Sequence, residues 1–132
     1  MKIGALAKAA GVAVDTVRYY ERRGLIPPAP RTSAGYRCYG TGDLTRLRFI
    51  VHAKELGFTL EEIGQLLAIK SGGGTCGEVR AVAERKAEEI AARMEKLARM
   101  RATLLALADQ CEQTADGDPC PILNILEDHH EP

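Results

Sequence analysis

TCGEVRAVAERKAEEIAARMEKLARMRATLLALADQC, residues 75–111, is one helical pattern with a cysteine near each end. Every seventh residue from Cys76 is apolar or a cysteine, and this row contains Cys76, Ala83, Ile90, Leu97, Leu104 and Cys111. A second row, displaced by four positions, is weaker and contains Arg80, Ala87, Met94, Arg101 and Ala108. No proline or glycine follows residue 77 in this stretch, and strong helix formers dominate it. The stretch therefore predicts one long helix with a coiled-coil seam.

The length of this helix limits what its two cysteines can do. Thirty-five residues of α-helix span about 52 Å, so Cys76 and Cys111 of one chain cannot bind the same ion. A single apolar seam also needs a partner to cover it. Two antiparallel copies would place Cys76 of one chain beside Cys111 of the other, with a thiolate pair at each end. The alternative is a plain coiled coil with two small buried cysteines, since free cysteine often serves as a small apolar residue.

A third cysteine follows the long helix closely. Residues 112–119 (EQTADGDP) are polar and typical of turns, and Cys120 and Pro121 then open a short apolar segment. Proline favours the first helical position, so Cys120 is expected at the N-cap, where the helix dipole stabilises a thiolate. We therefore predict a metal site made by Cys111 and Cys120 of one chain and Cys76 of the other. Three thiolates select a soft ion and exclude Mg²⁺ and Ca²⁺.

The composition limits the class of protein. The 132 residues suffice for one small domain plus an extended element. No apolar run approaches membrane-spanning length and the N-terminus lacks signal-peptide features, so we expect a cytoplasmic protein with reduced thiols and no membrane association. Aromatic residues make up only 5%, tryptophan is absent, and no Ser/His/Asp set, phosphate-binding glycine loop or His-x-x-x-His motif occurs. We therefore expect no enzymatic activity.

The formal charge is zero overall but is unevenly distributed. Residues 1–48 contain nine Lys or Arg against three Asp or Glu, whereas residues 49–132 contain nine against fifteen. A basic first third on an acidic body favours a nucleic-acid surface near the N-terminus. A merely solvated basic face is the alternative.

Two short helices around a glycine turn are predicted at the N-terminus. The first has an apolar face made by Ile3, Leu6, Ala7 and Ala10, and Gly11 ends it. The second has Val14, Val17 and Tyr20 inward, with Gly24 as its stop. Its other faces carry residue types that bind base edges and phosphates, namely Thr16, Arg18, Tyr19, Arg22 and Arg23. This pattern predicts a helix-turn-helix, although many all-α proteins contain the same shape.

The next segments predict a basic hairpin and two further helices. RTSAGYRCY, residues 31–39, predicts two short strands around a Ser-Ala-Gly turn, a "wing" able to bind the DNA backbone. Asp43 is expected as the N-cap of a helix over residues 44–56. Thr59 and Glu62 predict a capping box for a helix through about Ile69, and glycine-rich residues 71–74 predict a hinge.

Residues 1–70 resemble the MerR family of bacterial transcription regulators. The resemblance is carried by the VRYYE segment, the GYR-Y wing and the LGFTLEEI segment, and the long helix with its cysteines extends it to the heavy-metal-sensing branch. It implies a mainly α protein with a winged helix-turn-helix DNA-binding domain (1–70) and a hinge (71–75). An antiparallel coiled-coil dimerisation helix (76–111) would follow, and then a metal-binding loop, short helix and tail (112–132).

The resemblance also implies roles for individual residues and a mechanism. Thr16, Arg18 and Tyr19 would lie at or near the major groove of promoter DNA. The residues expected to hold the DNA backbone are Arg31, Tyr36, Arg37 and Tyr39. The homodimer would sit on a palindromic operator and repress without metal. With metal bound it would bend and untwist an overlong promoter spacer, so that RNA polymerase can engage both promoter elements.

The resemblance narrows the ion as well. Branches that sense monovalent copper usually lack a cysteine at the position of Cys76, so we expect a divalent ion. The zinc-sensing branch often has a second cysteine where Glu112 stands. Residues 83–100 and the CPIL segment are similar to mercury-sensing members, which favours Hg(II) and leaves Pb(II), Cd(II) and Zn(II) open.

Cys38, His129 and His130 are not assigned to the predicted metal site. We expect Cys38, where the family usually has an aliphatic residue, to fill the core, with a redox role as the alternative. His129 and His130 are expected to form a tail, with metal ligation as the alternative. A redox- or small-molecule-responsive regulator of the same fold, with structural cysteines, is the rival function. An iron–sulfur site would need four grouped cysteines, and a drug-binding regulator would need a larger C-terminal domain.

Overall fold

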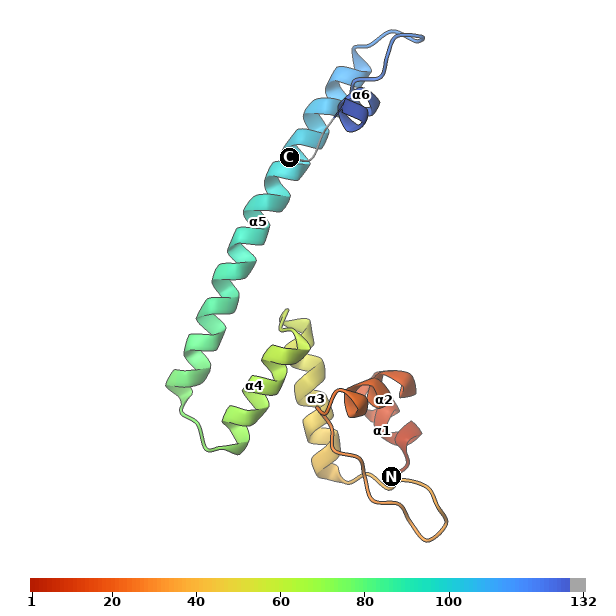
Figure 1. Ribbon diagram of the computed structural model, residues 1–132, viewed down its shortest axis with the longest axis vertical. Helices are drawn as coiled ribbons and strands as arrows, with labels where there is room; N and C mark the ends of the chain where they lie inside the picture. Colours follow the sequence, from red (N-terminus) through yellow and green to blue (C-terminus); the bar gives the residue numbers. More distant parts are fainter. Residues whose placement is uncertain (129–132) are drawn as a thin grey trace. The chain divides into compact units, whose positions relative to one another are not determined.

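The computed structural model describes residues 1–128, and these residues are mainly helical. Figure 1 shows the six helices of this part of the chain: α1 (Ile3–Ala10), α2 (Val14–Arg22), α3 (Thr41–Glu55), α4 (Leu60–Ser71), α5 (Cys76–Glu112) and α6 (Pro121–Asp128). The chain divides into two compact units, Met1–Ala83 and the part that begins at Glu84. The predicted mainly α fold, with a helix-turn-helix followed by a long helix, is confirmed. None of the helices within residues 1–128 combines the length and apolar character needed to cross a membrane.

Helices α1 to α4 share one apolar core. Helix α1 packs against α2 and α3, and α3 packs against α4. The core includes completely buried side chains from all four of these helices, namely Leu6 of α1, Val17 of α2, Leu47 and Ile50 of α3, and Ile63 of α4. Burying an aliphatic side chain of this size contributes about 1.5–3 kcal/mol. These contacts therefore fix the position of α2 relative to the other helices of the first unit.

The turn between α1 and α2 follows the expected glycine chemistry. Gly11 adopts the left-handed conformation (φ 75°) and its N–H bonds to the carbonyl of Lys8 at 3.2 Å. Such a φ is easy only for residues without a Cβ. Helix α2 then begins after Ala13, whose side chain provides no cap. Asp15 in the first turn of α2 complements the helix dipole instead.

Helix α3 begins three residues earlier than the sequence predicted. Its N-cap is Gly40, and the predicted N-cap Asp43 is the third helical residue, where its carboxylate accepts a hydrogen bond from the Gly40 N–H at 2.9 Å. An acidic residue is favoured both at the N-cap and at the third helical position, so the sequence alone does not distinguish the two. For α4 the predicted capping box is confirmed. Thr59 Oγ1 accepts from the Glu62 N–H at 3.2 Å, and Glu62 Oε1 accepts from the Thr59 N–H at 2.8 Å.

The wing, residues 31–39, contains one β-bridge in place of the two predicted strands. The bridge pairs Arg31 with Arg37, and the turn between them is closed by the Thr32 N–H bonding to the Tyr36 carbonyl at 2.7 Å. The Cys38 N–H also bonds to the Pro30 carbonyl at 3.0 Å. Prolines 27, 28 and 30 have no N–H to donate, so the ladder cannot extend toward α2.

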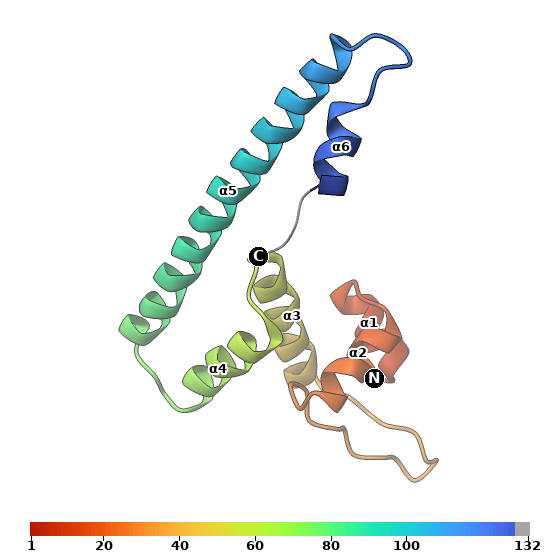
Figure 2. The same cartoon turned by 45° about the horizontal axis from the view of Figure 1, so that its top comes forward.

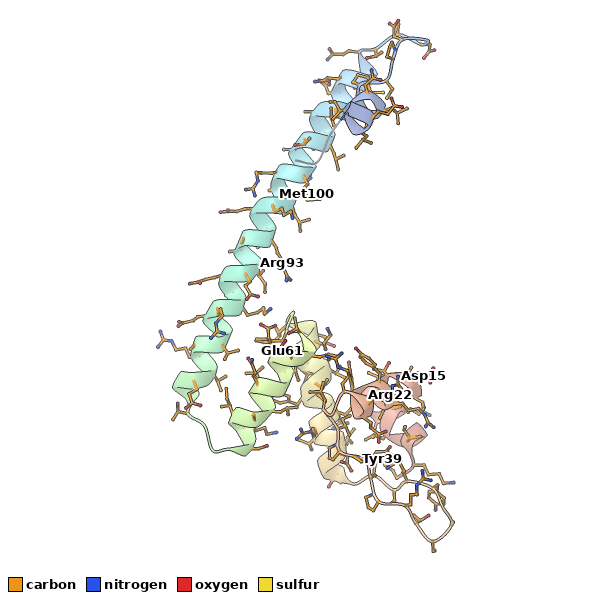
Figure 3. The ribbon with its side chains drawn as sticks, in the orientation of Figure 1. Asp15, Arg22, Tyr39, Glu61, Arg93 and Met100 are labelled. Carbon is orange, nitrogen blue, oxygen red and sulfur yellow. The ribbon has the colours of Figure 1, made fainter. Side chains whose placement is uncertain are left out.

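The second unit contains most of α5 and a short returning helix. Figures 1 and 2 both show α6 folded back beside the C-terminal part of α5. The seam side chains of α5 are largely exposed in the single chain: Leu97 and Leu104 each retain 60% of their surface. Arg93 and Met100 also project from this helix (Figure 3), and Met100 is half exposed. This long apolar seam is uncovered within one chain.

Candidate nucleic-acid interface and metal centre

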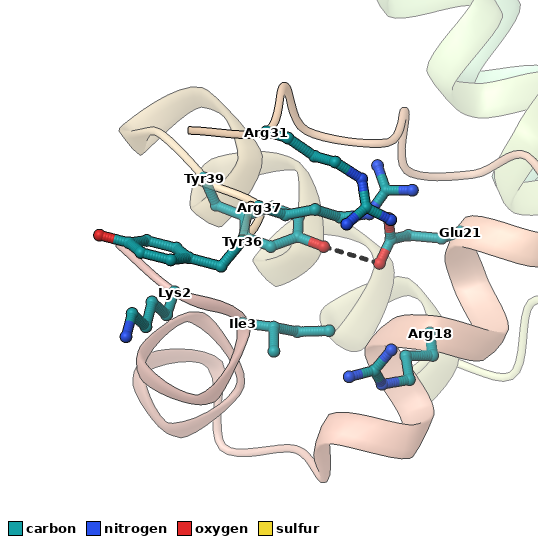
Figure 4. A pocket seen from close by; sticks show the side chains of 8 residues that line it. All are labelled: Lys2, Ile3, Arg18, Glu21, Arg31, Tyr36, Arg37 and Tyr39. Carbon is teal, nitrogen blue, oxygen red and sulfur yellow. Dashed lines mark hydrogen bonds between the residues drawn. The ribbon is translucent and has the colours of Figure 1, made fainter. Parts of the chain in front are cut away.

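A basic pocket lies between α2, the start of α1 and the wing (Figure 4). Its volume is about 250 Å³, and its lining contains Lys2, Ile3, Arg18, Glu21, Arg31, Tyr36, Arg37 and Tyr39. Four of these side chains are cationic and only one is acidic, so the pocket favours an anion. It brings together five of the seven predicted DNA-binding residues, one from α2 and four from the wing.

Hydrogen bonds within the wing hold its arginines beside the pocket. Arg31 donates from Nη1 to the Gly35 carbonyl at 3.0 Å, and Arg37 donates from Nη1 to the Ala29 carbonyl at 3.0 Å. Each guanidinium has five N–H donors, so donors remain for a phosphate. These two hydrogen bonds orient the guanidinium groups of Arg31 and Arg37 and leave further N–H donors available.

Tyr39 occupies a different environment from the one its predicted role suggests. Its ring is buried, with 2% of the residue exposed, and its hydroxyl donates a hydrogen bond to Glu21 Oε1 at 2.8 Å (Figure 4). Burial, followed by the hydrogen bond to Glu21, raises the pKa of Tyr39 to about 12. The bond joins the end of the wing to α2. We therefore interpret Tyr39 as a residue that positions the wing.

Replacing Tyr39 with phenylalanine should weaken the fold by about 1–3 kcal/mol at pH 8, because Glu21 would lose its donor. The folded-state pKa lies above the ordinary value of 10.0, so the stabilisation is complete below pH 10 and declines as the pH rises toward 12. Urea unfolding at pH 8 and pH 11, at one protein concentration, measures this. The difference between the native protein and Tyr39→Phe should shrink at pH 11. The exposed Tyr36→Phe serves as control, and an equal difference at both pH values would contradict the assignment.

Thr16 and Tyr19 lie on another face of α2. They line a separate shallow pocket that also includes Asp15, Tyr20, Lys54 and Leu60. Tyr19 is exposed, and the guanidinium groups of Arg22 and Arg23 each lie 5.9 Å from its ring centroid. The predicted residues of α2 therefore form two groups, with Arg18 facing the wing and Thr16 and Tyr19 turned away from it.

Two of the three predicted metal ligands lie together in the second unit. Cys111 stands in the last turn of α5, and Cys120 immediately precedes the first residue of α6, as predicted. Their Sγ atoms are 3.9 Å apart. The intervening loop is folded by bonds such as the Thr114 N–H to the Cys111 carbonyl at 3.2 Å, and Gly117 provides a positive φ of 93°. The polar loop between α5 and α6 thus brings the thiols of Cys111 and Cys120 together.

The two thiols differ electrostatically. The backbone N–H of Leu123, helped by that of Ile122 and by the Cys111 thiol, lowers the pKa of Cys120. The pKa of Cys111 is raised, first because its thiol hydrogen-bonds to Cys120 and then because the two charges repel. The N-terminus of α6 therefore favours a thiolate at Cys120, which is the protonation state that binds metal.

Cys76 lies at the start of α5 and is exposed. Among residues 1–128 no three His, Cys, Asp or Glu side chains of one chain form a metal cage. Cys111 and Cys120 thus bring two sulfur atoms together, while Cys76 is not part of this pair within one chain. His129 and His130 lie outside the described residues.

The prediction that Cys38 fills the core is wrong, because Cys38 is exposed. Successive side chains of an extended segment point to opposite sides. Since Tyr39 points into the core, its neighbour Cys38 points outward.

Sequence reasoning missed two charged residues of the basic pocket, Lys2 and Glu21, and placed a third lining residue, Ile3, only on the apolar face of the first helix. Lys2 lies with its ammonium nitrogen 4.2 Å from the ring centroid of Tyr36, and Glu21 accepts the Tyr39 hydroxyl. Both contacts join residues far apart in the chain, so no local pattern could predict them. The excess of basic residues before residue 48 was the one signal that pointed toward Lys2.

The first unit is a helix-turn-helix with a wing, and a basic pocket lies between α2 and that wing. This combination is typical of DNA-binding regulators. Comparison with known families agrees: the chain matches the family described as "MerR HTH family regulatory protein" over residues 1–69 and "MerR, DNA binding" over residues 44–107. The chain belongs to the MerR family of DNA-binding transcription regulators, which is not a class of enzymes.

Similar proteins cover nearly the whole chain. The mercuric resistance operon regulatory protein of Serratia marcescens is 39% identical over 132 residues, covering 100% of this chain and 91% of that protein. The transcriptional regulator ZntR of Escherichia coli K12 is 42% identical over 129 residues, covering 96% and 92%. The crystal structure of PbrR691 from Ralstonia metallidurans CH34 in complex with lead(II) matches with a TM-score of 0.82 and 35% identity, covering 96% and 98%.

Proposed function

We propose that the chain is a metal-responsive regulator that represses promoters without metal and activates them when a soft divalent ion binds three cysteines across a homodimer. The observation that carries this proposal is the pair of Sγ atoms, 3.9 Å apart, that Cys111 and Cys120 present at the junction of α5 and α6. Cys76 of the second subunit is the third ligand in this proposal. The similar proteins named above support it, since their names concern mercury resistance and a lead complex.

The chemistry of the ligands determines the kind of ion. Thiolates prefer soft ions, and zinc accepts four such ligands at about 2.3 Å in a tetrahedral site. Two sulfurs 3.9 Å apart are compatible with a common ion, because two zinc–sulfur bonds at the tetrahedral angle separate their sulfurs by roughly 3.8 Å. A site with three cysteines suits Hg(II), which we favour, and Pb(II), Cd(II) and Zn(II) are the alternatives.

The exposed seam of α5 supports the proposed antiparallel homodimer. Its largest members are Ile90, Leu97 and Leu104, at equal heptad spacing, and Leu97 and Leu104 each retain 60% of their surface in one chain. An apolar row on a 37-residue helix is stable when a second helix covers it. Antiparallel pairing places the start of one α5 beside the end of the other, which is the arrangement that the three-cysteine site requires.

A charge in the middle of this seam should dissociate the dimer. Leu97→Glu would place carboxylates close to the centre of the antiparallel pair, so the dimer dissociation constant should rise by at least about 100-fold. Sedimentation equilibrium measures it. The matched control is Lys96→Glu, at a neighbouring exposed position outside the two predicted seam rows. An unchanged dimer of Leu97→Glu would show that this seam is not the interface.

The basic pocket supports the DNA-binding part of the proposal. Arg31, Tyr36 and Arg37 would hold a backbone phosphate, while Arg18 and the Thr16–Tyr19 face of α2 approach the major groove. Metal binding would draw Cys111, Cys120 and the partner's Cys76 together and reorient the DNA-binding domains. The wings would then bend and untwist the promoter for RNA polymerase. The ion must bind the activating state more tightly than the repressing state, or it could not shift the equilibrium.

A competitive metal titration tests this proposal. The reduced full-length protein is titrated with Hg(II), Pb(II), Cd(II) and Zn(II) under thiol competition, with ultraviolet thiolate charge-transfer bands as the readout. We expect two ions per dimer and a clear preference for one metal. If none of the four ions binds tightly, the chain is a DNA-binding regulator with structural cysteines and another effector.

A further inference from the structure

We propose that Cys111 and Cys120 are also a redox modification site, at which a hydroperoxide oxidises the metal-free protein to an intramolecular disulfide. The disulfide would consume two of the three metal ligands, and a dithiol would restore them. Its formation does not depend on the proposed metal function; only its regulatory consequence rests on that function.

The geometry of the pair supports direct bond formation. The Sγ atoms lie 3.9 Å apart, and a disulfide requires about 2.05 Å. Cys111 is exposed and Cys120 half-buried, so a small oxidant can reach the pair. Both cysteines stand at helix ends joined by a loop that contains Gly117 in a positive φ conformation. The remaining approach therefore needs side-chain rotation and a small loop adjustment, not unfolding of α5.

The two sulfurs are placed to react in sequence. We assign Cys120, the residue immediately before α6, as the sulfur that meets the oxidant, and Cys111, whose sulfur lies 3.9 Å away, as the resolving group. The other two cysteines, Cys38 and Cys76, belong to the first unit and lie outside this pair.

The reaction balances as a two-electron oxidation by a hydroperoxide. The Cys120 thiolate attacks the peroxide, the O–O bond breaks, and Cys120 becomes a sulfenic acid while one oxygen leaves as water after gaining a proton. The Cys111 sulfur then attacks the Cys120 sulfur, the S–O bond breaks, and the second oxygen leaves as water with the proton of the Cys111 thiol. Two thiols and hydrogen peroxide thus give one disulfide and two waters. An exposed disulfide of this kind is accessible to thiol reductants.

The chain offers a direct test by peptide mass. Arg101 is the last lysine or arginine in the sequence, so trypsin releases residues 102–132 as one peptide that contains both cysteines, while Cys38 and Cys76 fall in separate peptides. The reduced, chelator-treated full-length protein is exposed to hydrogen peroxide, blocked with iodoacetamide and digested. We expect the peptide 102–132 to lose two hydrogens without becoming linked to another peptide. Reactive thiols should fall from four to two per chain.

Single cysteine-to-serine variants distinguish the proposed disulfide from other oxidation products. Cys38→Ser and Cys76→Ser should still form the disulfide, whereas Cys111→Ser should show added oxygen on residues 102–132 in place of the loss. Linkage of residues 102–132 to the peptide containing Cys76, or the absence of the two-hydrogen loss, would overturn the proposal. Oxidised protein should also lose tight Hg(II) binding and regain it after dithiothreitol. If reduced protein binds no metal but the disulfide forms, the metal function fails and the modification site stands.

Discussion

Replacing Cys76 with serine should remove the metal response of the protein and leave its operator binding intact. In the proposed dimer this substitution removes one of three thiolates from each site, although Cys76 lies far along α5 from Cys111 and Cys120. Loss of an outer-shell partner alone weakens metal binding 10- to 100-fold, so loss of a ligand should weaken it by more than about 100-fold. Metal titration under thiol competition measures the loss of affinity, and transcription from the operator promoter measures the loss of response.

The substitution should not disturb the fold. Cys76 is exposed in the first turn of α5, and the preceding Thr75 caps the helix by accepting a hydrogen bond from the Glu78 N–H at 3.2 Å. Cys38→Ser is the matched control, because Cys38 is equally exposed but belongs to the wing. Full metal affinity in Cys76→Ser would show that the site does not extend across the dimer. Equal losses in both variants would point to a general effect of removing a thiol.

The signals that could be read from the sequence are local ones. The capping box of Thr59 and Glu62 is complete within four residues, and the start of α6 follows from Pro121. Asp43 was misassigned because the N-cap and third helical positions both favour an acid, and only the backbone of Gly40 separates the two possibilities. The existence and type of elements were therefore predictable, while their starts were less so.

The parts that could not be predicted depend on contacts between distant residues. Tyr39, predicted to hold the DNA backbone, has a buried ring whose hydroxyl bonds to Glu21, and its neighbour Cys38, predicted to fill the core, is exposed. Lys2 joins the pocket only because the wing brings Tyr36 beside it. For the metal site, the sequence placed Cys111 and Cys120 together, and the 3.9 Å between their sulfurs agrees with that expectation. Cys76 of a second subunit is the proposed third ligand, and a contact between two chains has no local signal in the sequence.

Arg18→Ala should weaken operator binding without changing the metal stoichiometry. Arg18 is exposed on α2 and lines the basic pocket, so it stands where the recognition helix and the wing would meet DNA. Alanine is the best helix former, and α2 should therefore persist. Losing one specific arginine contact costs about 1–3 kcal/mol, so the dissociation constant should rise roughly 5- to 150-fold. Fluorescence anisotropy with labelled operator DNA at several salt concentrations measures the effect.

The salt series also distinguishes a base contact from a phosphate contact at Arg18. A phosphate contact would reduce the slope of log K against log salt by about one and weaken all sequences alike. A base contact would leave the slope nearly unchanged and relax discrimination at one operator position. Because Arg18 is proposed to approach the major groove while the wing residues hold the phosphate, we expect the base-contact pattern. Arg93→Ala on exposed α5 controls for charge, and operator affinity equal to that control would exclude Arg18 from the interface.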